Sequence, residues 1–157
     1  MAVGTSDVAR AGSHDLWPTA APLGDAHYAD EFTASTTKAL SHSPETWARY
    51  ILEGASLPMR IFLLVGWRVG LGFRLRRRGA VLGWPVVAES SDWVVLQQRS
   101  WLFGVALLMR VMDGEISWAT RVRYSSRLAG ATWSVIGVLH RHFAPRALHR
   151  AVARATP

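Results

Sequence analysis

The chain has 157 residues, half of them hydrophobic, and a formal net charge of +7. This length predicts one domain with enough apolar residues for a buried core. Cysteine is absent, which excludes disulfides, thiolate metal sites and cysteine nucleophiles and fits a reducing compartment. Lys38 is the one lysine among 18 basic residues. The arginines reflect either genome composition or an affinity for anions such as lipid head groups.

No stretch of the sequence is apolar enough to span a membrane. The most apolar windows, 61–67 and 102–109, are bounded by Arg60, Arg68 and Arg110, whereas a span needs about 20 mostly apolar residues. The amino terminus also lacks the basic-then-apolar order of a secretion signal. We therefore expect a soluble, cytoplasmic protein, with a weak contact to an anionic membrane as the alternative.

The amino-terminal residues have the composition of a tail. Residues 1–25 are rich in Ala, Gly, Ser, Pro and Asp without a sustained period, which predicts a disordered segment. The folded domain is then expected over 26–157. A first strand is predicted at 27–35, where an alternating apolar pattern that includes Phe32 is interrupted at Asp30.

Two helical stretches follow this strand. Ser43 can cap a helix, and the proline and glutamate after it suit the first helical turn. Gly54 suits the end of that helix. A second helix is predicted over 57–75, although its three glycines each weaken a helix by about 1 kcal/mol. The arginine run at 76–78 is interpreted as a solvated turn, with contact to an anionic surface as the alternative.

From residue 81 the period becomes that of strands, over 81–90, 92–100, 101–113 and 115–126. Asp113 and Gly114 predict a two-residue hairpin turn between the last two. One face of the first arm then carries Phe103, Val105, Leu107, Met109 and Val111. One face of the second arm carries Ile116, Trp118, Thr120, Val122 and Tyr124. The opposite face, with Ser117, Ala119, Arg121 and Arg123, is expected to meet water.

A long helix is predicted over 130–154. Its residues at three- and four-residue steps are Trp133, Ile136, Gly137, His140, Phe143, Ala144, Ala147, Leu148 and Ala151. This stripe is apolar except at His140, and it should cover the apolar face of the strands. Pro145 predicts a kink near 141–144 or a break into two helices.

Several segments carry a resemblance to a known superfamily over 26–153. They are Tyr28-Ala29-Asp30-Glu31-Phe32, Ser43-Pro44-Glu45-Thr46-Trp47, the stretch from Asp113-Gly114 to Thr120, and Trp133, Ile136, His140-Arg141 and Pro145. Their order resembles the helix-grip superfamily of START domains, birch-pollen-allergen-like proteins and polyketide cyclases, and is most similar to an uncharacterised family of that kind. The resemblance implies an α+β fold in which an antiparallel sheet wraps on a long C-terminal helix. About five strands are evident, fewer than the six or seven usual there.

The resemblance also implies a cavity between sheet and helix that holds an apolar small molecule or lipid. The residues expected to face it are Trp118, Thr120, Val122 and Tyr124 on the last strand, Trp133, Gly137 and His140 on the helix, and Trp67 and Trp84 at its edge. Core packing is the alternative for these strand and helix residues and for the tryptophans. Gly137 is the strongest indication of a cavity, because a glycine there leaves room.

His140 has two interpretations. It is either a structural histidine bonded to a backbone group, to Thr120 or to Tyr124, or a cavity group that orients or protonates a ligand. The second interpretation leads to an enzyme similar to polyketide cyclases/aromatases or dehydratases. A peripheral membrane or interaction module that uses Arg68, Arg74 and 76–78 is a third hypothesis.

The sequence assigns no catalytic residue, and whether any reaction is catalysed stays open. No cofactor and no nucleic-acid partner are expected, and the oligomeric state is not indicated. His140 and His142 point to nearly opposite sides of a helix. His142 and His149 share a face but lack a third ligand, so no metal site is predicted.

Overall fold

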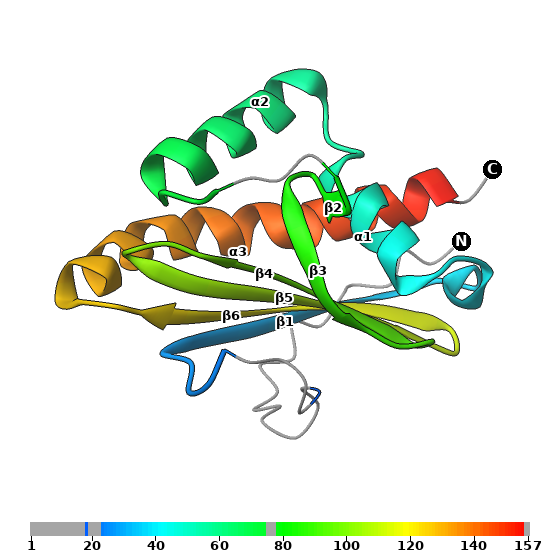
Figure 1. Cartoon of the computed structure of the whole chain (residues 1–157). Coiled ribbons are helices and arrows are strands. Elements are labelled where there is room, and N and C mark those ends of the chain that lie inside the picture. Colours follow the sequence, from blue (N-terminus) through cyan, green and yellow to red (C-terminus); the bar gives the residue numbers. More distant parts are fainter. Residues whose placement is uncertain (1–17, 19–22, 75–77, 156–157) are drawn as a thin grey trace.

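A computed structural model describes Pro18 and residues 23–74 and 78–155 (Figure 1). The strands are β1 (Tyr28–Ser35), β2 (Ala80–Val81), β3 (Trp84–Glu89), β4 (Trp93–Arg99), β5 (Phe103–Met112) and β6 (Glu115–Tyr124). The helices are η2 (Ala39–Ser41), α1 (Pro44–Leu52), α2 (Leu57–Val65), η3 (Gly66–Gly70) and α3 (Arg127–Ala155). Most of the expected tail, 1–25, lies outside the described residues, as do Arg76 and Arg77 of the arginine run.

The strands form one six-stranded antiparallel sheet in the order β1-β6-β5-β4-β3-β2. With the long C-terminal helix on one side of this sheet, the expected α+β class is confirmed (Figure 1). The sixth strand arises because the stretch 81–90 is two strands. Leu82 and Gly83, with φ of 45° and 88°, reverse the chain between them. A leucine rarely adopts this left-handed conformation, so its sequence did not predict the turn.

The β5–β6 hairpin has the predicted two-residue loop. Met112 pairs with Glu115, and Gly114 lies between them with φ of 76°. The register places Val105 opposite Val122, so the two apolar faces coincide. This shared face is the floor of the main hydrophobic core.

The prediction that the opposite face of β6 meets water was wrong in part. Arg123 is exposed, but Ser117 and Ala119 are only 0% and 4% exposed. A second apolar cluster covers this face with Leu23, Val95, Ala106, Leu108 and Ala119. Leu23, which belongs to the stretch interpreted as a tail, is 3% exposed and is part of this cluster.

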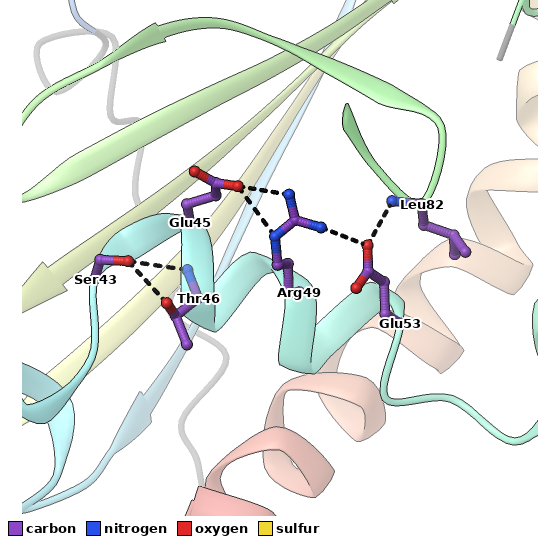
Figure 2. A network of polar contacts seen from close by, with 6 residues as sticks. All are labelled: Ser43, Glu45, Thr46, Arg49, Glu53 and Leu82. Carbon is purple, nitrogen blue, oxygen red and sulfur yellow. Dashed lines mark hydrogen bonds and ion pairs between the residues drawn. The ribbon is translucent and has the colours of Figure 1, made fainter. Parts of the chain in front are cut away.

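Helix α1 begins where its sequence predicts. The Ser43 hydroxyl accepts a hydrogen bond from the Thr46 amide at 3.2 Å, which satisfies one of the free donors of the first turn. Arg49 bridges Glu45 and Glu53 along the helix, and Glu53 Oε1 also accepts from the amide of Leu82 at 3.0 Å (Figure 2). This last bond ties α1 to the β2–β3 turn.

Helix α3 runs without a break past Pro145, contrary to one of the two outcomes expected there. It starts at a Ser126 cap, whose hydroxyl accepts from the Ala129 amide at 3.2 Å. Trp133, before the proline, and Leu148, after it, are both buried in the main core. Packing on both sides of the proline therefore holds the two parts in line, although one helical hydrogen bond is lost.

Helix α2 differs from α1 and α3 because none of its residues is buried. It continues into the π-helical turn η3 and ends at Gly70, earlier than the predicted end at residue 75. Figure 1 shows α2 on the same side of the sheet as α3 and farther out. Within the described part of the chain, no helix is long and apolar enough to cross a bilayer.

Candidate ligand cavity between the sheet and helices α2 and α3

An apolar cavity of about 230 Å³ lies between the sheet face, α3 and the α2–η3 segment. Its walls on α1, α2, η3 and the loop after η3 are Ile51, Leu52, Ala55, Met59, Phe62, Leu63, Gly66, Trp67, Leu71 and Phe73. The strands contribute Trp84, Val105, Leu107, Trp118 and Thr120. Helix α3 contributes Trp133, Ile136, Leu139, His140, Phe143, Ala144, Ala147 and Arg150. The polar members of this lining, indole nitrogens aside, are Thr120, His140 and Arg150.

Nine residues were expected to face a cavity, and six of them belong to the lining of this cavity. They are Trp67, Trp84, Trp118, Thr120, Trp133 and His140. Val122 is fully buried in the core instead, and the ring of Tyr124 stacks on His27 at 5.0 Å. That these residues bind a ligand stays a prediction.

Gly137 does not leave the room that its position suggested. A Cβ placed on it would lie 3.1 Å from Nε1 of Trp133, so the Trp133 ring already fills the space beside this glycine. The glycine is therefore explained by close packing of an indole on the helix backbone. Gly137 lies outside the cavity lining.

Sequence reasoning missed the roof of the cavity. Met59, Phe62 and Leu63 of α2 face it from the side opposite to the sheet. The available signal was that α2 is apolar at every position except Arg60, which indicates apolar neighbours on more than one side.

A polar cluster stands at the α3 side of the cavity. Nε2 of His140 lies 3.1 Å from Oγ1 of Thr120 and 3.3 Å from Oδ2 of Asp30. The Tyr28 hydroxyl donates to the same Asp30 oxygen. The sheet register explains why Asp30 and Thr120 both lie beside His140, because Asp30 on β1 pairs directly with Thr120 on β6.

The Asp30 carboxylate sets the electrostatics of this cluster. Burial, together with the hydrogen bond to Asp30, raises the pKa of Tyr28, so its phenol stays protonated and donates. The Asp30 carboxylate can accept a hydrogen bond from Nε2 of His140, the imidazole nitrogen that faces it. Oδ1 of Asp30 is buried and has no partner. His140 is thus a carboxylate-backed imidazole at the wall of an apolar cavity.

Three tryptophans of the wall share an unusual property. The indole N–H groups of Trp84, Trp118 and Trp133 are buried and have no hydrogen-bond partner. A buried donor without a partner costs about 1–3 kcal/mol. Three residues of the wall therefore carry buried donors that no described protein group accepts from.

The fold and the cavity define the protein as an α+β domain in which a six-stranded antiparallel sheet and a long C-terminal helix flank an apolar cavity. This architecture is compatible with a helix-grip fold. Comparison of the chain with protein-family models, curated proteins and solved structures gave no match. Within the described residues, no group of three His, Asp or Glu side chains is placed to hold a metal ion.

Proposed function

We propose that this chain binds an apolar small molecule or lipid in the cavity between the sheet and helices α2 and α3. The observation that carries the proposal is the cavity itself, about 230 Å³ with a lining that is apolar except at a few positions. Small-molecule sites typically measure about 300–1,000 Å³ and combine apolar walls with a few placed polar groups. The volume favours a compact ligand or one segment of a longer chain.

The polar atoms of the wall favour a ligand with hydrogen-bond acceptors. Three tryptophans of the lining carry unpartnered indole donors, whereas the Thr120 hydroxyl and Nε2 of His140 already face each other. A carbonyl or ether oxygen that reached one indole after a small ring rotation would remove the cost of a buried, unpaired N–H. An apolar ketone or ester fits these walls better than a polyol.

The exposed members of the lining indicate the entrance. Phe62 on α2 and Leu139 on α3 are 59% and 47% exposed, and Arg150 is exposed as well. These residues place the mouth between α2 and α3. The likeness to helix-grip domains supports this location, because those domains bind ligands between the sheet and the C-terminal helix.

Native mass spectrometry of the purified protein tests the proposal. We expect a fraction of the protein to carry a small molecule that solvent extraction recovers. Ala147→Phe fills the cavity wall and should remove the adduct. Ala131→Phe makes the same change on an exposed position of α3 outside the cavity and should retain it. An adduct present equally in both variants would contradict the proposal.

The second candidate function is acid–base catalysis, for example of a dehydration. The observation that favours it is the Asp30–His140 pair. An imidazole backed by a carboxylate can act as an acid or base toward a bound molecule. Incubation of a recovered ligand with the wild type and with Asp30→Asn separates this from simple binding. Catalysis predicts a product whose formation slows in the variant, and an unchanged ligand in both excludes it.

A further inference from the structure

Helix α2 is apolar on the side that faces away from the cavity as well as on the side that lines it. Met59 and Leu63 face the cavity, whereas Leu57, Ile61 and Val65 do not line it. A helix that is apolar all round is normally buried in a core or in a membrane, yet no residue of α2 is buried.

The outward apolar residues form a continuous stripe, which we name the α2 patch. It consists of Leu57, Ile61, Val65 and Val69, at every fourth position, and their exposed fractions are 66%, 53%, 55% and 79%. Single exposed apolar residues are ordinary on protein surfaces, but a row of four on one helix is not. Figure 1 shows that α2 is the outermost element on its side of the molecule, so this stripe is accessible to a large partner.

The segment that contains the α2 patch carries charges of one sign. Between Glu53 and Glu89 the sequence contains six arginines and no acidic residue. Of these, Arg68, Arg74 and Arg78 are exposed in the structure. A surface that combines a bare apolar stripe with cations alone is complementary to the head groups and acyl chains of an anionic lipid layer.

An exposed tryptophan lies beside the same segment. Trp101 is 73% exposed, and its ring packs against the backbone of Gly72, where a Cβ would lie 3.3 Å from its Nε1. Tryptophan prefers the boundary between lipid head groups and acyl chains, because its ring is apolar and its N–H is polar. Its position extends the apolar surface beyond the end of η3.

We propose that the α2 patch is a docking surface for an anionic membrane, with the stripe at the acyl boundary and the surrounding arginines at the lipid head groups. This docking does not depend on whether the cavity holds a ligand. It does place the roof of the cavity, and the exposed Phe62 at its mouth, against lipid. A molecule that enters or leaves the cavity would then pass directly between protein and membrane.

Other occupants fit the α2 patch less well. A second copy of this chain would bring two arginine-flanked surfaces together, which like-charge repulsion opposes. A nucleic acid would satisfy the arginines but leave the apolar stripe without a partner.

Cosedimentation of the full chain with vesicles tests the docking surface. The probes are phosphatidylcholine vesicles with and without phosphatidylserine. We expect binding to the mixed vesicles that weakens with added salt, and little binding to phosphatidylcholine alone. The double variant Ile61→Ser/Val65→Ser, which leaves the cavity lining intact, should reduce binding about tenfold or more.

A matched control removes two exposed apolar side chains elsewhere. Leu40 and Val87 are 69% and 44% exposed and lie outside α2 and η3, so Leu40→Ser/Val87→Ser should bind vesicles like the wild type. Thermal unfolding of both variants checks that each is folded. Equal vesicle binding by the two variants, or no binding of the wild type to phosphatidylserine, would overturn the proposal. A wild-type dimer that Ile61→Ser/Val65→Ser dissociates would overturn it in favour of a second copy.

Discussion

Oγ1 of Thr120, in the middle of β6, lies 3.1 Å from Nε2 of His140, near the middle of α3. This contact is one of two polar links between the sheet and α3 at the wall of the cavity, and the other joins Asp30 to His140. It also agrees with one of the two interpretations that the sequence allowed for His140. A structural bond and a role at the cavity are compatible, because His140 lines the cavity as well.

The energy of this link can be measured with a double-mutant cycle of Thr120→Val and His140→Phe. Each single variant should destabilise the fold, because each leaves a buried polar atom with fewer partners. We expect a coupling energy of about 1 kcal/mol in urea unfolding, typical of a hydrogen bond between neutral groups. A coupling near zero would mean that the contact contributes nothing and that His140 is held by Asp30 alone.

Tyr28 should make the fold sensitive to alkaline pH. Its folded-state pKa is raised by burial and by the bond to Asp30, so above about pH 10 the folded state holds a proton that the unfolded state has lost. This contribution to stability is complete below the unfolded pKa and declines as pH rises above it. Tyr28→Phe should flatten the alkaline part of the stability curve from urea unfolding, whereas an unchanged slope would assign the decline to other groups, such as Tyr124, whose pKa burial also raises.

Glu45 and Glu53 provide a matched pair on α1. Both accept from Arg49, but only Glu53 also accepts from the amide of Leu82 at 3.0 Å (Figure 2). The ion pairs are partly exposed and contribute little. Glu53→Ala should therefore lower the unfolding free energy by about 1 kcal/mol more than Glu45→Ala. Equal losses of unfolding free energy in the two variants would show that the hydrogen bond to the β2–β3 turn contributes no net stability.

The sequence predicted local features wherever a short-range rule decided them. Asp113 and Gly114 set the hairpin, and its register decided which side chains of β5 and β6 face the core. Ser43 marked the start of α1 in the same way. Each of these features depends on neighbours in the chain and needs no knowledge of distant residues.

The features that the sequence did not predict depend on contacts between distant segments. Leu23 is buried with Ala119 in the second apolar cluster, although it belongs to a stretch whose composition indicates a tail. The cavity roof on α2 follows from where this helix lies relative to the sheet and α3, and no local pattern encodes that. Asp30 interrupts the apolar alternation of β1. The structure explains this residue, because pairing with Thr120 brings its carboxylate to His140.

Binding of an apolar molecule in the cavity can be measured directly, because the chain has four isoleucines whose methyl groups serve as probes. Ile51 and Ile136 line the cavity, Ile61 lies on the α2 patch, and Ile116 is fully buried in the core outside the cavity. The measurement is a methyl NMR titration of isoleucine-labelled protein with a medium-chain ketone such as 2-undecanone. Binding in the cavity predicts saturable shifts of Ile51 and Ile136 with Ile116 unmoved. Unsaturable shifts, or none at Ile51 and Ile136, would contradict it.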